Sequence, residues 1–513
     1  MSYPSIFISQ LNYISEDPNY NYNKILKSYT KSINSSADIA IFSRYAVSGY
    51  IQKIPTSPKD FFNQCTHTIE KLAIQTKQQN TSILIGSIKQ LNNTIHETIY
   101  LIQNGTTIEL ITFVANTPQT TIPITFSINN KNFALCPISE NPELPTHSEN
   151  TILIIMDNIP YTQHTNTRHN AILKLTNNKY AVYINQVGGY NNVVFYGKSF
   201  FTFNNNYNFL NTWKEDSKIC TADSKKNNCD SYTSDSDIES DYQALMLALK
   251  DYVYKNSMTQ VIIGLSGGVD SALVATIAAD ALGPANVLSF MLPTKYTSEI
   301  SIIDSQECAT RLGISYNILS IERIFQTSLT TLENIFVGTQ EDITEENLQS
   351  RIRGLILMAL SNKFKLLLLS TGNKSELLVG YATLYGDMCG GFAPIKDIYK
   401  TRVYEISQWR NKNVPANSLC NNTEVIPSRI IEKHPSAELR YNQTDQDTLP
   451  AYTTLDSILK LLVDQCLSTE EVINKGHNSK DVDYIAHLIK KSDFKRKQAP
   501  TGLIITNPYN TIT

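Results

Sequence analysis

The hydrophobic pattern is most regular in the second half of the chain, where short apolar runs alternate with longer amphipathic segments. The short runs predict buried strands at residues 260–265, 286–292, 315–320 and 365–370. The helical periodicity predicts helices at residues 241–256, 269–282, 300–312 and 345–364. Because strands and helices alternate, the pattern favours a doubly wound parallel sheet, which is an α/β fold.

The first half also mixes apolar runs with helical segments, but less regularly. Short runs recur at residues 5–11, 37–42, 82–86, 98–102, 133–137, 151–156, 181–185 and 193–195, with helical periodicity at residues 23–33 and 58–77. This pattern favours an α/β sandwich. A polar stretch follows, so we expect a first domain at residues 1–217, a linker at 218–240 and a second domain at 241–513.

Composition narrows the class of protein. A chain of 513 residues exceeds what one ordinary core holds, which agrees with two domains. The net charge of −3 provides no attraction for a polyanion, so nucleic acid is not an expected partner. No apolar stretch is long enough to span a bilayer, so we expect no membrane association. The eight cysteines contain no CxxC pair, which favours a reducing, cytoplasmic location.

A glycine-containing loop between a predicted strand and a predicted helix carries the clearest chemical signal. Its backbone N–H groups and the helix N-terminus would attract an anion, so the loop is typical of a phosphate-binding site. Asp270 needs a cation between its carboxylate and a polyphosphate, and Mg²⁺ is the natural candidate. The alternative is an ordinary turn between strand and helix. The residues concerned are Gly264, Leu265, Ser266, Gly267, Gly268, Val269, Asp270 and Ser271.

The loop differs from the two best-known nucleotide-binding loops. It has no terminal Gly-Lys-Ser/Thr, and no GxGxxG pattern accompanies it. It resembles the pyrophosphate-binding loop of the N-type ATP pyrophosphatases. That resemblance implies cleavage of ATP between the α- and β-phosphates, adenylation of a carboxylate or carbonyl, and displacement of AMP by a nitrogen nucleophile.

Several polar strings follow the loop in a fixed order. They are residues 346–354 (ENLQSRIRG), 370–376 (STGNKSE), 385–391 (YGDMCGG), 434–440 (HPSAELR), 443–447 (QTDQD) and 494–500 (FKRKQAP). In this order the strings resemble the synthetase domain of the NAD⁺ synthetase family, from Tyr242 to Pro508. The resemblance implies a C–N ligase that condenses deamido-NAD⁺, ATP and ammonia to NAD⁺, AMP and pyrophosphate.

The resemblance also implies a role for individual residues. The ATP phosphates would lie against the loop from Gly264 to Ser271, and Thr371 would also contact ATP. Asp270 and Glu376 would share Mg²⁺. Lys400 would lie beside the phosphates, so Lys400 and Asp270 are the predicted catalytic residues of this half. The residues implied to contact deamido-NAD⁺ are Asn347, Glu376, Asp387 and Lys495.

Two further points concern the same half of the chain. The alternative role for Lys374, Lys400 and Lys495 is ordinary solvated surface charge. A closing loop would keep water from the acyl adenylate until ammonia arrives, and residues 336–343 or 411–426 could form it.

The first half resembles the nitrilase-like amidase domain that releases ammonia from glutamine in whole-length family members. Residues 183–190 (YINQVGGY) and 194–200 (VFYGKSF) carry this resemblance, with weaker matches at residues 48–50 and 85–87. It implies a nitrilase-like fold and a Glu–Lys–Cys triad, in which Glu is the base, Lys steadies the oxyanion and Cys is the nucleophile.

The triad itself departs from the family pattern. Arg44 stands where the family has its glutamate, and residues 112–124, where its lysine is expected, contain none. Cys136 lies near the nucleophile position but is followed by Pro137 rather than an acidic residue. A thiol without a base or oxyanion partner is more often structural than reactive. We therefore expect a pseudo-amidase, with Glu97 or Glu140 as the alternative source of a base.

The glutamine-binding positions have also changed. The family's serine and lysine fall on Ile159 and Thr165, and Arg168 is retained. These differences predict that nitrogen comes from free ammonia, although glutamine is the family's donor. Two other functions stay open: an adenylating enzyme for another acid, such as nicotinate mononucleotide or a GMP-synthetase-like substrate, and a non-catalytic scaffold. Family resemblance implies a homo-oligomer, at least a dimer through the synthetase domains.

Overall fold

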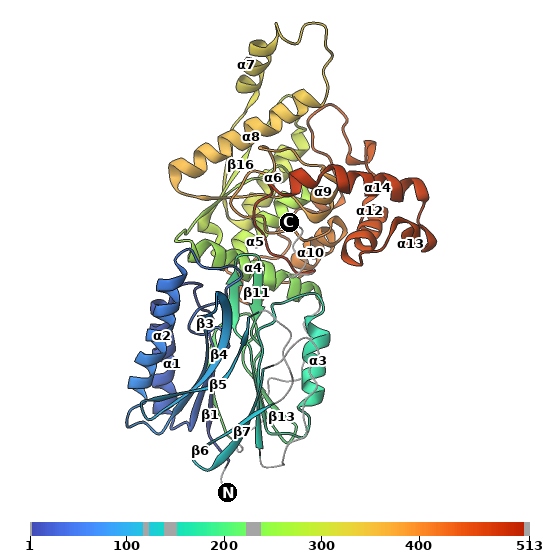
Figure 1. The fold of residues 1–513 in the computed structure, drawn as a ribbon. Helices are drawn as coiled ribbons and strands as arrows, with labels where there is room; N and C mark the ends of the chain where they lie inside the picture. Colours follow the sequence, from blue (N-terminus) through green and yellow to red (C-terminus); the bar gives the residue numbers. More distant parts are fainter. Residues whose placement is uncertain (1–2, 116–122, 138–150, 222–236, 507–513) are drawn as a thin grey trace. The chain divides into compact units, whose positions relative to one another are not determined.

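The computed structural model describes residues 3–115, 123–137, 151–221 and 237–506, and it divides into two compact units (Figure 1). Unit 1 comprises Met1–Tyr190 and Val194–Ser234, and unit 2 comprises Asn191–Val193 and Asp235–Thr513. The predicted linker overlaps β14 (Asp216–Cys220) at its start and α4 (Asp237–Lys255) at its end. Residues 222–236 lie outside the described residues, and the predicted domain boundaries stay a prediction.

Unit 1 is an α/β sandwich of two six-stranded sheets with helices on their outer faces (Figure 1). The first sheet has the order β14-β1-β2-β3-β4-β5, and the second has the order β13-β12-β9-β8-β7-β6. The helices are α1 (Pro18–Asn34), α2 (Pro58–Gln75) and α3 (Thr165–Leu175). The other strands are β1 (Ile6–Gln10), β2 (Ile39–Phe42), β3 (Ser82–Leu91), β4 (Thr94–Gln103), β5 (Thr106–Val114), β6 (Ile124–Ile128), β7 (Lys131–Pro137), β8 (Thr151–Met156), β9 (Ala181–Ile184), β10 (Val187–Tyr190), β11 (Val193–Tyr196), β12 (Phe200–Phe203) and β13 (Asn206–Phe209).

The core of unit 1 lies between its two sheets. Ile8 and Ile41 from the first sheet are fully buried in one apolar cluster with Leu135 and Ile154 from the second. Paired asparagines with positive φ join β6 to β7 (Asn129 and Asn130) and similarly join β3 to β4 and β12 to β13. Asparagine tolerates the left-handed conformation that a two-residue hairpin turn requires, so these pairs favour the hairpins.

Unit 2 contains the predicted parallel sheet, in the order β17-β16-β15-β18. Its strands are β15 (Val261–Gly264), β16 (Val287–Met291), β17 (Ser315–Ile318) and β18 (Leu367–Leu369). Its other helices are α5 (Val269–Leu282), α6 (Glu299–Leu312), α7 (Glu322–Leu332), α8 (Ile343–Phe364), α9 (Lys374–Val379), α10 (Lys400–Lys412), α11 (Ser428–Glu432), α12 (Tyr452–Leu459), α13 (Thr469–Asn474), α14 (Ser479–Lys491) and α15 (Asp493–Arg496). Short 3₁₀ turns η1 (Pro284–Asn286) and η2 (Asp445–Asp447) and a π-helical turn η3 (Lys460–Asp464) complete the unit.

The sheet of unit 2 brings two predicted site segments together. β15 and β18 are neighbours and run parallel, so their carboxyl ends lie at the same edge of the sheet. The glycine loop follows β15, and residues 370–376 follow β18. This edge is where open α/β sheets bind ligands. Among the helices that the structure describes, none is long and apolar enough to cross a membrane, and the cytoplasmic location stays a prediction.

Candidate active site

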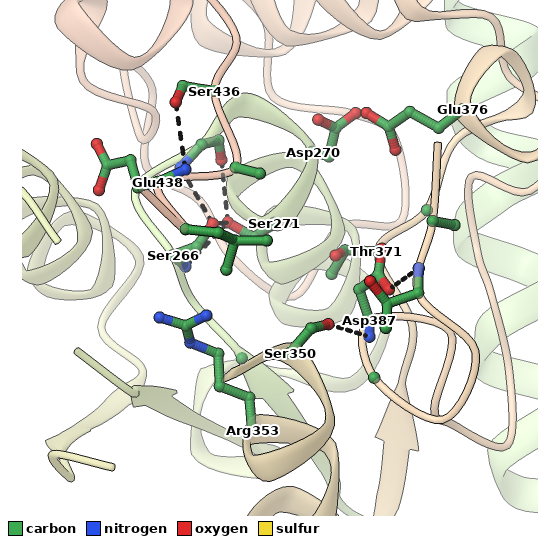
Figure 2. A pocket seen from close by; sticks show the side chains of 18 of the residues that line it. Ser266, Asp270, Ser271, Ser350, Arg353, Thr371, Glu376, Asp387, Ser436 and Glu438 are labelled. Carbon is green, nitrogen blue, oxygen red and sulfur yellow. Dashed lines mark hydrogen bonds between the residues drawn. The ribbon is translucent and has the colours of Figure 1, made fainter. Parts of the chain in front are cut away.

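The glycine loop connects β15 to α5 and is held by its own serines (Figure 2). Ser271 Oγ accepts a hydrogen bond from Ser266 N at 3.2 Å and lies 3.1 Å from Ser266 Oγ. Gly267 has a φ of +81°, and a Cβ there would lie 2.5 Å from the carbonyl oxygen of Ser301. Only glycine fits this position. The loop backbone therefore lies close against α6.

A cavity of about 710 Å³ lies beside the loop, within unit 2. Every predicted loop residue except Gly267 lines it, and so do all of the residues predicted to contact ATP, deamido-NAD⁺ or Mg²⁺ elsewhere in this unit. Those other residues are Asn347, Thr371, Glu376, Asp387, Lys400 and Lys495. The fold thus gathers side chains that are more than 200 positions apart in sequence around one space. Figure 2 shows Asp270, Glu376, Thr371 and Asp387 around this cavity.

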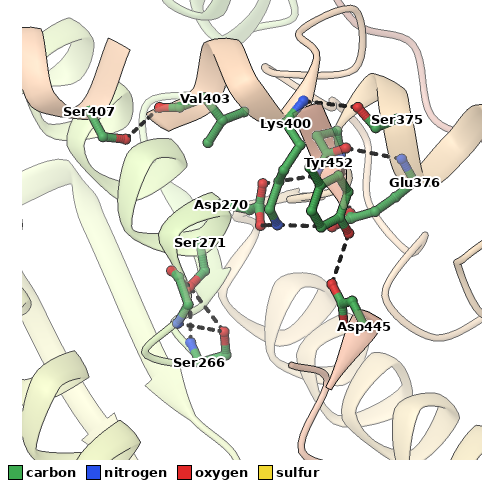
Figure 3. A network of polar contacts seen from close by, with 12 residues as sticks. Ser266, Asp270, Ser271, Ser375, Glu376, Lys400, Val403, Ser407, Asp445 and Tyr452 are labelled. Atoms are coloured by element: carbon green, nitrogen blue, oxygen red, sulfur yellow. Dashed lines mark hydrogen bonds and ion pairs between the residues drawn. The ribbon is translucent and has the colours of Figure 1, made fainter. Parts of the chain in front are cut away.

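Lys400 joins two carboxylates on one side of the cavity (Figure 3). Its Nζ lies 2.5 Å from Asp270 Oδ2 and 3.1 Å from Glu376 Oε1. Lys400 is 2% exposed, which contradicts the alternative that it is a solvated surface charge. The ring of Tyr452 lies below the ammonium, with its centroid 5.3 Å from Nζ, and Tyr452 Oη donates to Asp445 Oδ2 at 2.8 Å.

The charges of this cluster depend on one another. Burial raises the pKa of Glu376 to about 8, an effect that Lys400 opposes and Asp270 reinforces. Burial alone would lower the pKa of Lys400, but Asp270 and Glu376 outweigh it and raise that pKa above its ordinary value. Lys400 is therefore charged at neutral pH, and its nearer partner is Asp270. Burial also raises the pKa of Asp445.

Asn373 links the two carboxylates through the start of α9. It is fully buried, and its Nδ2 donates to Asp270 Oδ1 at 2.9 Å. Its Oδ1 accepts from Glu376 N at 3.0 Å, as the N-cap residue of a capping box. One side chain thus caps the helix that carries Glu376 and orients Asp270. The sequence prediction assigned no role to Asn373, although it lies within the string 370–376.

The described residues contain no group of three or more His, Cys, Asp or Glu side chains arranged to hold a metal ion. Mg²⁺ does not need such a group, since one or two carboxylates together with substrate phosphates and water complete its shell. Asp270 and Glu376 beside a phosphate-type loop fit this donor set.

The wall opposite the loop is built by α8 and by residues 383–391. Thr383 Oγ1 donates to Asn347 Oδ1 at 2.8 Å, and Asp387 Oδ1 accepts from Thr383 N at 2.6 Å. A Cβ at Gly386 would lie 2.2 Å from Ser350 Oγ, so glycine allows this segment to pack tightly against α8. Thr383 thus places Asn347 and Asp387 side by side in the cavity wall, and their contact with deamido-NAD⁺ stays a prediction. Burial raises the pKa of Asp387.

The NAD synthase family model matches residues 241–499, and this range includes the whole cavity. The chain belongs to the NAD synthase family. The glutamine-dependent NAD(+) synthetase of Rhodobacter capsulatus is 50% identical over 270 residues, covering 53% of this chain and 49% of that protein. The Thermotoga maritima enzyme of the same name is 52% identical over 265 residues, covering 52% and 45%. The match therefore spans about half the length of these curated relatives.

Solved structures extend the similarity of this NAD synthase family member to both units. A glutamine-dependent NAD⁺ synthetase from Acinetobacter baumannii, in complex with ADP, has a TM-score of 0.72 at 29% identity, covering 100% of this chain and 97% of that chain. A glutamine-dependent NAD(+) synthetase from Cytophaga hutchinsonii has a TM-score of 0.77 at 17% identity, covering 98% and 95%. The predicted fold class, a nitrilase-like sandwich followed by a parallel-sheet synthetase domain, is confirmed.

Arg353 is a cavity residue of this NAD synthase family member to which the sequence prediction gave no role. It lies on α8, and its Nε donates to the carbonyl of Leu292 at 2.9 Å. Figure 2 shows its guanidinium on the side of the cavity where Ser266 and Glu438 lie. Burial lowers the pKa of Arg353 to about 10, and the charge of Glu438 opposes this effect. The sequence feature that could have indicated this residue is its position inside the string 346–354.

The segment from Lys433 to Asp445 covers the cavity and is clamped at Glu438. Glu438 Oε1 accepts from Ser298 Oγ at 3.0 Å, from Ser301 Oγ at 2.8 Å and from Lys433 Nζ at 2.6 Å. Ser298 is the N-cap of α6. Residues of the strings 434–440 and 443–447 line the same cavity as the loop, and the sequence prediction did not foresee that Glu438 anchors this segment.

The two segments predicted to close over the site differ in their position relative to the cavity. None of residues 411–426 lines the cavity. Arg410, fully buried, holds this segment by donating to the carbonyls of Asn413 at 3.0 Å and Asn422 at 2.9 Å, and it pairs with Asp280 at 2.6 Å. A closing role for this segment is therefore not supported. Residues 341–343 do line the cavity, so closure by residues 336–343 stays a prediction.

In unit 1, Cys136 lies on β7 in an apolar cluster and is 5% exposed. Tyr183 and Phe200 belong to the same cluster. Burial raises the pKa of the Cys136 thiol to about 11, with a small opposing effect of Lys179. A thiol that stays neutral at physiological pH is a weak nucleophile.

Arg44, at the position of the expected base, forms a buried ion pair. Its Nη2 lies 2.7 Å and its Nε 2.9 Å from Glu97 Oε2, and both side chains are 2% exposed. Tyr45 Oη donates to Glu97 Oε1 at 2.6 Å, and Arg44 Nη1 donates to Asn158 Oδ1 at 3.0 Å. Both oxygens of Glu97 are thus occupied, which argues against Glu97 as a replacement base. Glu140 lies outside the described residues.

Proposed function

We propose that the protein is an NAD⁺ synthetase that amidates deamido-NAD⁺. A nicotinate carboxylate oxygen attacks the α-phosphorus of ATP, the bond to the β-phosphate oxygen breaks, and pyrophosphate leaves. Ammonia then attacks the acyl carbon of the adenylate, AMP leaves, and the amide and a proton are the other products. The observation that carries this proposal is the single cavity that combines a phosphate-type loop, a Lys400–carboxylate cluster and the Asn347–Asp387 wall in a member of this family.

The residues divide the work by their charge. The N–H groups of the loop and the start of α5 would bind the ATP phosphates, while Thr371 would contact ATP from the end of β18. Lys400 and Arg353 supply positive charge where negative charge develops on the departing pyrophosphate. Asn347, Glu376, Asp387 and Lys495 would contact deamido-NAD⁺.

Asp270 and Glu376 would hold Mg²⁺, which, when bound, would neutralise charge on the phosphates. The side chains of Asp270 and Glu376 are each 17% exposed, so partial burial strengthens their field on this part of the cavity. Asn373 and Lys400 keep the pair oriented in the meantime.

We infer that the nitrogen comes from free ammonia. Glutamine hydrolysis in unit 1 would require an activated thiol, but Cys136 lies in an apolar cluster with a raised pKa. The position of the base is taken by Arg44, whose charge is neutralised by Glu97. These features support a unit 1 that has lost amidase activity and kept its fold.

The test is NAD⁺ formation from deamido-NAD⁺ and Mg-ATP, with ammonium and glutamine compared as donors. We expect turnover with ammonium and none with glutamine. Efficient turnover with glutamine would show that unit 1 is an active amidase. If deamido-NAD⁺ gives no turnover with either donor but nicotinate mononucleotide does, the substrate is a different acid from the one proposed.

We also infer that the protein is a homo-oligomer. α8 exposes apolar side chains, among them Leu355 at 63% and Phe364 at 59%, and an apolar surface of this kind favours association. Light scattering on the purified protein should give at least twice the mass of one chain, and a monomer would contradict this inference.

A further inference from the structure

The Lys400 ammonium holds the place that a divalent cation would need. Asp270 Oδ2 pairs with Lys400 at 2.5 Å, Asp270 Oδ1 accepts from Asn373 at 2.9 Å, and Glu376 Oε1 pairs with Lys400 at 3.1 Å. The oxygens that face one another across the pair therefore already share one cation. A second cation of charge +2 cannot enter between the same oxygens without strong repulsion from the ammonium.

We propose that Lys400 is an exchangeable internal counterion, which covers the Asp270–Glu376 pair and leaves it for the phosphates when the cation and nucleotide arrive together. This inference rests on the proposed function in one respect, namely that Asp270 and Glu376 are the cation ligands. It adds an order of events: the carboxylate pair has little affinity for a divalent cation alone and takes one up with the nucleotide.

The surroundings of Lys400 allow its head group to move while its backbone stays fixed. Lys400 N donates to Ser375 Oγ at 2.9 Å, and Thr401 N donates to Asp456 Oδ2 at 2.8 Å. The start of α10 is thereby tied to α9 and α12. The side chain above it is a flexible four-carbon stem that ends at the cavity, with the face of Tyr452 beside it at 5.3 Å. Lysine suits this exchange because it is a point charge without a fixed geometry.

The charge balance favours the exchange. Lys400 pairs with Asp270 and Glu376, and its ammonium lies over the ring of Tyr452, whose Oη donates to Asp445 Oδ2, so three carboxyl groups surround one ammonium. A divalent cation would bring two positive charges to these carboxyl groups in place of one, while the phosphates would receive Lys400. If the site is open in only a fraction of the molecules, the apparent affinity for the ligand equals the intrinsic affinity multiplied by that fraction. Removing the cover should therefore tighten cation binding.

The experiment measures Mn²⁺ binding to the full-length protein without nucleotide, by the loss of the free Mn²⁺ signal in electron paramagnetic resonance. We expect Lys400→Met to bind Mn²⁺ roughly tenfold more tightly than the unchanged protein, and Lys400→Arg to give no such gain. The double variant Lys400→Met/Asp270→Asn should lose the gain. Lys495→Met is the matched control, because it removes another cavity cation that donates to the carbonyls of Gly380 and Ala382 and leaves the pair covered.

Equal Mn²⁺ affinity of the unchanged protein and Lys400→Met would overturn the proposal, as would an equal gain in Lys495→Met. If Lys400→Met does not fold, Asp270→Asn alone decides: a covered pair predicts little change in Mn²⁺ affinity without nucleotide, and a marked loss would contradict it. Turnover is recorded separately. Absence of NAD⁺ formation would contradict the proposed function but would not change the measured Mn²⁺ affinities. Failure of the proposed function and failure of the counterion proposal can therefore be distinguished.

Discussion

Arg44 in unit 1 and Lys400 in unit 2 are both buried cations held by carboxylates, but their surroundings differ. Arg44 has Glu97 and Asn158 as partners and lies 4.9 Å from the centroid of the Phe113 ring. Lys400 faces a cavity of about 710 Å³. The first cluster has one cation for one carboxylate, whereas the second has one cation beside the carboxyl groups of Asp270, Glu376 and Asp445.

The difference separates a structural ion pair from a ligand site. Burial and ion pairing occur in both kinds of cluster, so neither alone identifies function. Access to a cavity does distinguish them. Asp270, Glu376 and Lys400 line a cavity that a ligand can enter, whereas Arg44 and Glu97 are each 2% exposed and pair with one another. By this criterion the cluster of unit 2 supports the proposed synthetase site, and the Arg44–Glu97 pair of unit 1 is a structural ion pair.

The largest expected effect is on Asp270. Asp270→Asn keeps the shape of the side chain but removes the charge that pairs with Lys400 and that is proposed to hold the cation. We expect turnover with ammonium to fall about a hundred- to a thousandfold, measured as NAD⁺ formation at saturating Mg-ATP. Asp280→Asn is an unsuitable control because it would break the buried Arg410 pair, whereas Asp493→Asn lies outside the cavity and should leave turnover unchanged. Unchanged turnover in Asp270→Asn would remove it from the metal role.

The corresponding change in unit 1 should affect stability and spare activity. Glu97→Ala leaves Arg44 buried without its carboxylate, and breaking a buried pair in this way costs about 3–5 kcal/mol of unfolding free energy. Chemical denaturation measures it, and ammonium-dependent turnover of the folded fraction should not change.

A double variant, Arg44→Met/Glu97→Leu, controls for the lost charge. Apolar residues of similar volume can replace a buried pair at little net cost, so most of the lost stability should return. If Glu97→Ala instead lowers turnover while stability is kept, the two clusters are coupled and the comparison fails.

Unit 2 could be predicted more completely than unit 1, for physical reasons. Its central strand β15 and its strand β18 are buried on both faces and give uninterrupted apolar runs, so the loop at residues 264–271 and α5 were predicted at the right positions. The edge strands β5 and β6 were missed because they are half exposed and their apolar pattern is weak. The signal for β6 lay in Asn129 and Asn130, a turn pair between two short runs.

Within the site, residues that share a motif with the family could be predicted, and residues that act through tertiary contacts could not. Asn373 and Arg353 lie inside recognised strings. The neighbouring sequence does not indicate that Asn373 contacts Asp270 or that Arg353 lines the cavity. Tyr452 lies outside every string, and its position below Lys400 follows only from the packing of α12 against α10. The Arg44–Glu97 pair joins regions 53 positions apart, so the sequence showed an arginine at the expected position of the base but not its pairing with Glu97.

The thiol of unit 1 tests whether its chemistry is lost. A pKa raised to about 11 means that the thiolate of Cys136 accumulates only as the pH rises toward that value. At pH 8 we expect alkylation of Cys136 to be roughly a hundredfold slower than that of a thiol with the usual pKa of about 8.5. Mass spectrometry after iodoacetamide treatment measures the rate, with the exposed Cys466 as internal reference. Stoichiometric labelling of Cys136 by an electrophilic glutamine analogue at neutral pH would show an active amidase.

The smallest effect, and the sharpest for unit 2, concerns Asn373. Asn373→Ser keeps an oxygen that can cap α9 but loses the amide that donates to Asp270 at 2.9 Å. A hydrogen bond to a charged group contributes about 1.5–3 kcal/mol, so the KM for Mg²⁺ should rise roughly tenfold or more, while the KM for deamido-NAD⁺ changes little.

The same substitution at another helix start separates orientation of Asp270 from helix capping. Asn478 caps α14 by accepting from Lys480 N and Asp481 N, and it does not line the cavity. Asn478→Ser should therefore leave both KM values unchanged. If Asn373→Ser behaves like Asn478→Ser, Asp270 needs no partner besides Lys400, and the carboxylate pair is oriented by the internal counterion alone. If only Asn373→Ser raises the KM for Mg²⁺, the Asn373 amide orients the Asp270 carboxylate for its ligand. In unit 1, by contrast, Arg44 and Tyr45 already pair with both oxygens of Glu97.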